Sequence, residues 1–159
     1  MYSRILVALE HSGYDASILT HVKRLHACCG ASVVLIHVAD GWAARNQRHL
    51  HLRESEEMRD DREYLERMCA ELTALGIDSD CVLGNGSPAS EIAAAAEREG
   101  CDLIAMATHG HGFFGDLMRG SVADGVRHRT TVPLLLVRGT SDGREALHTG
   151  EHAVVGSDP

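Results

Sequence analysis

A glycine-rich stretch near the centre of the C-terminal half is the part of this sequence best suited to bind phosphate. It runs from Thr108 to Ser121 and holds four glycines within eleven residues. Glycines allow backbone N–H groups to approach a ligand closely and to adopt positive φ angles. A short helix is expected from Ser121 to Arg129, and the free N–H groups at a helix N-terminus favour an anion. Composition and position therefore predict an anion site.

Two widespread phosphate motifs do not fit this stretch. A Walker A loop requires Gly-Lys-Ser or Gly-Lys-Thr, and the only lysine of the chain is Lys23. The dinucleotide pattern G-x-G-x-x-G is matched by Gly110, Gly112 and Gly115. However, it follows the fourth apolar run instead of the first, and leucines at 134–136 stand where an acidic residue is expected. We therefore interpret the stretch as a phosphate loop of another kind.

The histidines of this stretch, His109 and His111, form an H-x-H pair that suggests a metal ligand. No third ligand stands in register, so hydrogen bonding within the loop is the simpler interpretation. The same side chains could polarise a phosphate, but no nucleophile with a base partner and no paired carboxylates accompany them. The pattern favours a binding protein over a dedicated enzyme, with slow ATP hydrolysis or self-phosphorylation as the enzymatic alternative.

Apolar runs alternate with amphipathic stretches along the whole chain. We expect five strands, at Ile5–Leu9, Val33–Val38, Cys81–Leu83, Leu103–Ala107 and Val132–Val137. Four helical stretches separate them, and this alternation requires crossover connections. The sequence therefore predicts an α/β protein with an open, doubly wound, five-stranded parallel sheet and four helices, a Rossmann-like architecture. Ligands of such sheets bind beyond the carboxyl ends of the strands, where the glycine-rich stretch begins.

Composition narrows the classes of partner. The length of 159 residues suits one main domain, and the formal net charge of -8 opposes binding to DNA or RNA. No apolar run approaches the roughly 20 residues that span a membrane, and the N-terminus does not look like a signal peptide. We therefore expect a cytoplasmic protein with no nucleic-acid or membrane partner. The odd number of cysteines, five, predicts reduced thiols instead of a disulfide framework.

The stretch from Gly110 to Ser121 resembles the nucleotide loop of the universal stress proteins, which ends in a glycine, nine residues, a glycine and a serine or threonine. Gly110, Gly120 and Ser121 fit that spacing. Further segments resemble the family's strands and turns, namely Ile5–Ser12, Leu35–Val38, Gly86–Pro88, Cys101–Met106 and Val132–Val137. The resemblance implies a universal stress protein domain over 1–138, followed by a polar C-terminal tail over 139–159.

The resemblance also implies a ligand, because some members of the family bind ATP or AMP, with Mg²⁺ as a companion of the nucleotide. Transferred by position, the contacts to adenine, ribose and phosphate fall at Ala8, Leu9, Glu10, Val38, Ala107, His109, Gly110, Gly120, Ser121 and Val122. Two positions depart from the family pattern: Ala107 replaces a glycine and adds a methyl group beside the ligand, and Glu10 replaces an aspartate. Ser121 could bind phosphate or Mg²⁺, or could serve only as the N-cap of its helix.

The family's members often act as homodimers in stress adaptation. The last expected strand, Val132 to Val137, should lie at an edge of the sheet, where Pro133 is tolerated. An uncovered apolar edge invites pairing with a second copy, so we expect a homodimer through this strand. Two alternatives remain beside a nucleotide-binding regulatory homodimer: a slow ATPase, and a ligand-free protein-interaction module whose site Ala107 has closed.

Overall fold

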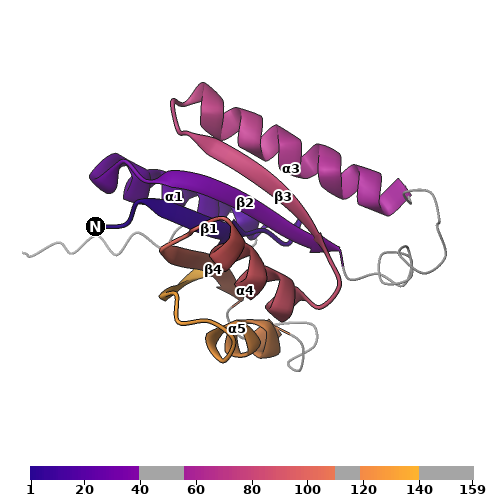
Figure 1. The fold of residues 1–159 in the computed structure, drawn as a ribbon. Helices are drawn as coiled ribbons and strands as arrows, with labels where there is room; N and C mark the ends of the chain where they lie inside the picture. Colours follow the sequence, from indigo (N-terminus) through magenta and orange to yellow (C-terminus); the bar gives the residue numbers. More distant parts are fainter. Residues whose placement is uncertain (40–55, 110–118, 140–159) are drawn as a thin grey trace, which may run out of the picture.

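The computed structural model describes residues 1–39, 56–109 and 119–139 (Figure 1). Its strands form one five-stranded parallel sheet in the order β3-β2-β1-β4-β5. The strands are β1 (Arg4–Ala8), β2 (Ser32–Ala39), β3 (Ser79–Asn85), β4 (Leu103–His109) and β5 (Leu134–Gly139). The helices of the described ranges are α1 (Asp15–Cys29), α3 (Glu56–Ala74), α4 (Pro88–Arg98) and α5 (Arg119–Arg127). The expected α/β class with a five-stranded parallel sheet is confirmed.

The strand order reverses at β1, which occupies the centre of the sheet. Val7 of β1 is paired with Leu35 of β2 on one side and with Ala105 of β4 on the other. From β1 the chain first proceeds outward to β2 and β3, and then returns to the other side of β1 to form β4 and β5. The carboxyl ends of β1 and β4 therefore flank the point of reversal, where sheets of this kind bind their ligands.

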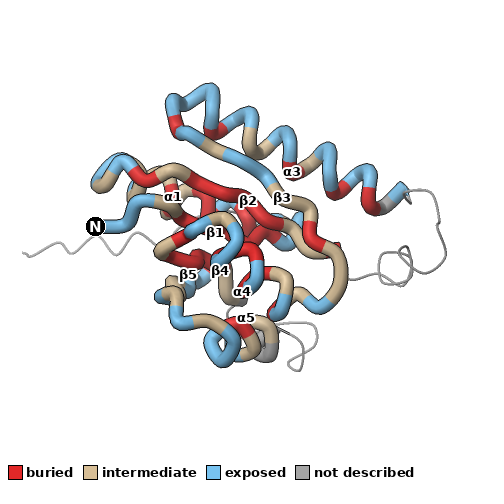
Figure 2. The backbone as a smooth tube through the Cα atoms, in the orientation of Figure 1, coloured by how far each residue is buried: buried red, intermediate tan, exposed pale blue. Residues whose placement is uncertain are grey.

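Two apolar layers fix the helices on the sheet. On one face, side chains of α1 and α3 such as Ile18 and Leu65 pack with Val7 and its neighbours. On the other face, Ile92 of α4 and Val126 of α5 pack with the alternate strand positions. Figure 2 shows the buried residues concentrated in the sheet between these helices. The period of two along each strand sends successive side chains to opposite layers, so both faces are apolar.

Each strand differs by one or two residues from its expected bounds, and β3 and β5 differ by two residues at both ends. β3 extends from Ser79 to Asn85, beyond its three-residue apolar run, because its backbone pairs with β2 over the whole length. β5 begins at Leu134, after Pro133, which has no N–H to give to a neighbouring strand. The Pro133 carbonyl still accepts a hydrogen bond from the Ile104 N–H at 2.9 Å. β5 is an edge strand, as expected.

The helix ends follow the local sequence. Gly30 ends α1 in the left-handed region, at φ 69°, and its N–H donates to the His26 carbonyl at 2.7 Å. Ser87 precedes α4 at the N-cap, with Pro88 in the first turn, but the Ser87 side chain makes no capping hydrogen bond. No helix within the described ranges is long and apolar enough to cross a membrane. All five cysteines are free thiols, as expected.

Candidate functional site

The carboxyl end of β1 brings three of the expected site residues to the point of strand reversal. Ala8, the last residue of β1, is paired with Ile36 of β2 and with Met106 of β4. The Leu9 N–H continues toward β2 and donates to the Ile36 carbonyl at 2.8 Å. Ala8 and Leu9 are buried, whereas Glu10 is exposed. The chain therefore emerges from the sheet at Glu10, beside the ends of β2 and β4.

Val38 and Ala107 lie near the ends of β2 and β4, but their side chains pack on opposite faces of the sheet. Val38 is paired with Gly84 and packs with the layer under α4 and α5. Ala107 is paired with Val137 and packs with the layer under α1 and α3. A ligand on the Val38 face would therefore meet the backbone of Ala107. The Ala107 methyl group lies on the other face of the sheet from Val38, and its effect on a ligand stays a prediction.

The segment expected to bind phosphate is described only where it begins, at the end of β4, and where it ends, in α5. His109 is the last residue of β4, and Gly110 lies outside the described residues together with the rest of 110–118. Gly120 and Ser121 lie in the first turn of α5, which begins at Arg119, two residues earlier than expected. Ser121 is therefore inside the helix, and the interpretation of it as an N-cap is wrong. Val122, in the same turn, is half-buried and packs with the layer under α4 and α5.

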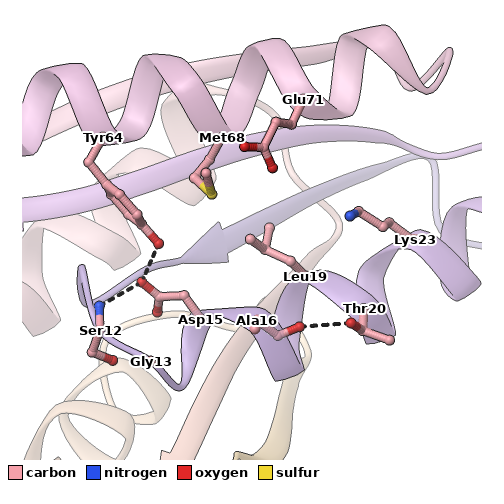
Figure 3. Close-up of a pocket in the computed structure, with 10 residues that line it drawn as sticks. All are labelled: Ser12, Gly13, Asp15, Ala16, Leu19, Thr20, Lys23, Tyr64, Met68 and Glu71. Atoms are coloured by element: carbon pink, nitrogen blue, oxygen red, sulfur yellow. Dashed lines mark hydrogen bonds between the residues drawn. The ribbon is translucent and has the colours of Figure 1, made fainter. Parts of the chain in front are cut away.

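The buried carboxylate of Asp15 fixes the turn that carries Glu10. Asp15 is only 2% exposed and accepts hydrogen bonds from the Glu10 and Ser12 N–H groups, each at 3.0 Å. The Tyr64 hydroxyl of α3 donates to the same carboxylate at 2.7 Å (Figure 3). Burial, and then this hydrogen bond, raise the pKa of Tyr64, so its hydroxyl stays protonated as a donor. Three donors thus satisfy Asp15 and hold the turn against α3.

A second carboxylate, that of Asp61 on α3, lies between His11 and His37. His11 Nδ1 lies 2.7 Å from Asp61 Oδ1, and His37 Nε2 lies 3.4 Å from Asp61 Oδ2. His37 Nδ1 donates to the Leu9 carbonyl at 2.9 Å, since a carbonyl oxygen can only accept. The His11 ring is stacked on the Tyr64 ring, with their centroids 4.1 Å apart. α3 therefore supports both the end of β1 and the turn that follows.

His11 is also the one non-glycine residue in the described ranges with a positive φ, 57°. A left-handed conformation is unfavourable for a residue with a side chain and persists where surrounding contacts impose it. The hydrogen bond to Asp61 and the stacking on Tyr64 are such contacts. Spacing along the sequence gives no sign of this cluster, because His11 and Asp61 are separated by 50 positions.

A cavity of about 280 Å³ opens between α1 and α3 (Figure 3). Asp15 and Tyr64 line it from one side, and Lys23 of α1 and Glu71 of α3 contribute the opposite charges at its rim. Its lining comes from α1, from α3 and from the turn that precedes α1, and none of the expected site residues belongs to it. Within the described ranges, no three histidine, cysteine or acidic side chains gather as metal ligands would.

The open parallel sheet, its central reversal and the helix behind β4 define a Rossmann-like α/β protein. A sequence model of the universal stress protein family matches residues 1–138. The chain belongs to that family.

Relatives cover nearly the whole of the matched region. Universal stress protein MJ0577 of Methanocaldococcus jannaschii is 28% identical over 158 residues, covering 87% of this chain and 96% of the relative. The solved structure of MJ0577 superposes with a TM-score of 0.73 at 27% identity, covering 88% of this chain and 98% of its own. Universal stress protein YxiE of Bacillus subtilis is 25% identical over 148 residues, covering 87% of this chain and 100% of the relative.

A more distant structure shares the fold. The universal stress protein of Archaeoglobus fulgidus in complex with dAMP has a TM-score of 0.63 at 18% identity. The match covers 86% of this chain and 98% of that protein.

Proposed function

We propose that this protein binds an adenine nucleotide, ATP or AMP, across the carboxyl ends of β1, β2 and β4. One observation carries the proposal: Ala8 ends β1 beside Met106 of β4, at the point where the strand order reverses. The chain emerges there into an exposed turn on one side and, after β4, leads to the N-terminus of α5. The dAMP complex of the relative from A. fulgidus supports the class of ligand.

The base and the sugar fit the β1 side of this edge. Val38 offers an apolar wall for adenine, and the backbone at Ala8 and Leu9 lies within the same row of strand ends. The exposed Glu10 carboxylate suits the ribose hydroxyls, which are hydrogen-bond donors. Because Asp15 accepts the Glu10 N–H, the backbone of this turn is held in place before a ligand arrives.

The phosphates fit the α5 side. Gly120 and Ser121 lie in its first turn, where backbone N–H groups have no partner within the helix and the dipole favours an anion. Ala107, His109, Gly110 and Val122 would flank the phosphates by position. Mg²⁺ would come with the phosphates, which supply several of its oxygen ligands, and Glu10 or Ser121 could add a protein oxygen.

We further propose a regulatory homodimer that acts in the stress response, with the nucleotide state altering the dimer or a partner's surface. β5 lies at the edge of the sheet, and Leu136 on it is 48% exposed. An edge strand presents unpaired backbone groups to a second copy, and its apolar side chains add buried area. The family membership of residues 1–138 supports the role in stress adaptation.

Thermal unfolding with and without nucleotide tests the proposed ligand. ATP or AMP at about 100 times its dissociation constant adds roughly 2.7 kcal/mol to the free energy of unfolding. For a domain of this size the melting temperature should rise by several degrees. GTP at the same concentration is the control for unspecific binding of phosphates. A melting temperature unchanged by millimolar ATP and AMP, with Mg²⁺ present, would favour the ligand-free interaction module. Release of phosphate from ATP above the uncatalysed background would favour the slow ATPase.

A further inference from the structure

Side-chain hydrogen bonds join α3 to the start of the edge strand β3 at Cys69 and Ser79, a contact that we call the seam. The Cys69 thiol donates to the Ser79 carbonyl at 3.2 Å, and the Ser79 hydroxyl donates back to the Cys69 carbonyl at 3.1 Å. The Thr73 hydroxyl, one turn further along α3, lies 2.8 Å from the Ser79 hydroxyl. Reciprocal bonds of this kind hold the helix directly over the start of the strand.

Cys81 lies on the same face of β3 as Ser79, because side chains two positions apart on a strand point the same way. The next residue of that row, Leu83, packs with the layer under α1 and α3, as Cys69 itself does. Cys69 Sγ lies 3.2 Å from the Ser79 carbonyl oxygen, and Cys81 follows Ser79 two positions later on the same face of β3, so the two thiols are neighbours and Cys69 acts on the pKa of Cys81. Cys81 is exposed, whereas Cys69 is half-buried. The seam therefore pairs an accessible thiol with a shielded one.

We propose that Cys69 and Cys81 are a redox-modification site, at which a low-molecular-weight disulfide such as glutathione disulfide converts the two thiols into a disulfide. The exposed Cys81 thiolate attacks one sulfur of glutathione disulfide and displaces one glutathione thiolate. The Cys69 thiolate then attacks Cys81 Sγ, and the second glutathione leaves. Two protons and two electrons pass from the protein, and the oxidant is reduced to two thiols. The bond ties α3 to the edge strand.

The surroundings set the speed of this exchange. Burial, followed by the neighbouring Cys69, raises the pKa of Cys81, so the reactive thiolate is scarce at neutral pH and becomes more abundant as the pH rises. Cys101 belongs to the opposite layer of the sheet, and burial raises its pKa to about 11. Cys28 is exposed at the end of α1 and provides a matched thiol outside the seam.

Incubation of the reduced full-length protein in glutathione buffers of increasing oxidising strength tests the site. Peptide mapping by mass spectrometry should find a Cys69–Cys81 linkage that is reversed by dithiothreitol and forms faster at pH 9 than at pH 7. The linkage closes a loop of thirteen residues, so the melting temperature of the oxidised protein should rise by several degrees.

Variants separate this outcome from unspecific oxidation. Cys69→Ser should stop at a glutathione adduct on Cys81, whereas Cys28→Ser should form the linkage as the wild type does. A persistent glutathione adduct on Cys81 of the folded wild type would overturn the proposal. A linkage that forms only after the chain is unfolded in urea would overturn it too, because the native seam would then not present the two thiols to one another.

Discussion

His11 Nδ1 lies 2.7 Å from Asp61 Oδ1, so the turn after the first strand is fastened to α3 across 50 positions of sequence. The same carboxylate lies near His37 Nε2, and His37 Nδ1 donates a hydrogen bond to the Leu9 carbonyl. Asp61 is 8% exposed. A buried carboxylate that links a strand end to a turn should contribute both to stability and to the shape of the proposed site.

Asp61→Asn tests this link, because it keeps the size of the side chain and removes its charge. The free energy of unfolding should fall by about 1–3 kcal/mol, the typical cost of weakening a hydrogen bond to a buried charged group. Urea unfolding of the two proteins measures the difference. Asp60→Asn, at the exposed neighbouring position, should leave the free energy of unfolding nearly unchanged. Equal losses in both variants would show that the contact with His11 contributes nothing specific.

Tyr64→Phe removes the α3 hydroxyl that donates to the buried Asp15. The Glu10 and Ser12 N–H groups still donate to Asp15, and the free energy of unfolding should fall by about 1–2 kcal/mol. The ring still fills its place beside His11, so a change larger than this is not expected. Tyr2→Phe, on the exposed Tyr2, is the matched control and should have no measurable effect. An unchanged melting temperature in Tyr64→Phe would mean that the Asp15 turn needs no support from α3.

The architecture follows from the sequence because two kinds of apolar pattern alternate in it. Strands buried on both faces of a parallel sheet are continuous apolar runs, whereas the helices between them have apolar residues every three or four positions. The residues that join β1 to α3 leave no such periodic signal. His11 follows its strand like many polar turn residues, and its partner Asp61 is one of several acidic residues in a charged helix. The length of β3 could not be predicted for a related reason, since backbone pairing with β2 extends the strand through polar residues such as Asp80.

The direction of the Ala107 side chain shows how the site could be predicted only in part. The glycine-rich stretch indicated which strand ends matter, and Ala8 and Met106 do lie side by side there. Which face a side chain occupies depends on its register within the sheet. Ala107 follows Ala105 into the layer under α1 and α3, away from Val38 and Val122. Spacing along the chain predicted that the site lies at the carboxyl ends of the strands. It could not predict that Ala107 packs on one face of the sheet and Val38 and Val122 on the other.

The Asp102 carboxylate ties the start of β1 to the start of β4, and its contribution should depend on pH. Burial by itself would raise the pKa of Asp102, but hydrogen bonds from the Arg4 and Ser3 N–H groups outweigh it, and the pKa is lowered from 3.8. A carboxyl group with a lowered folded pKa stabilises the protein above its unfolded pKa, and this contribution disappears as the pH falls through the folded pKa.

Asp102→Asn should therefore unfold more easily than the wild type at pH 7, and the difference should shrink as the pH falls below 3.8. Urea titrations at a series of pH values measure it. Asp78→Asn, at an exposed position, should show no such pH dependence. A difference between wild type and Asp102→Asn that stays constant down to the acid transition would contradict the assignment.

Leu136→Lys tests the proposed homodimer through β5. Leu136 is 48% exposed on the edge strand, so a lysine is tolerated in the folded monomer but places two like charges near one another in a dimer paired through β5. Sedimentation at tens of micromolar protein should show a dimer for the wild type and a monomer for the variant. A wild-type monomer, or a variant that dimerises as well as the wild type, would argue against pairing through β5.

Calorimetric titration of ATP and AMP into the wild type and Gly120→Val tests nucleotide binding at this edge of the sheet most directly. A valine side chain in the first turn of α5 should block the approach of phosphate to the helix N–H groups and weaken binding by about tenfold or more, equivalent to about 1.4 kcal/mol. Gly100→Asn is the matched control. Gly100 precedes β4 and so lies at the amino ends of the strands, away from the proposed site, and asparagine tolerates its φ of 64°. Saturable binding to the wild type and to Gly100→Asn, lost or weakened in folded Gly120→Val, is the predicted result. Equal affinity in Gly120→Val, or no heat from the wild type at millimolar nucleotide, would contradict it.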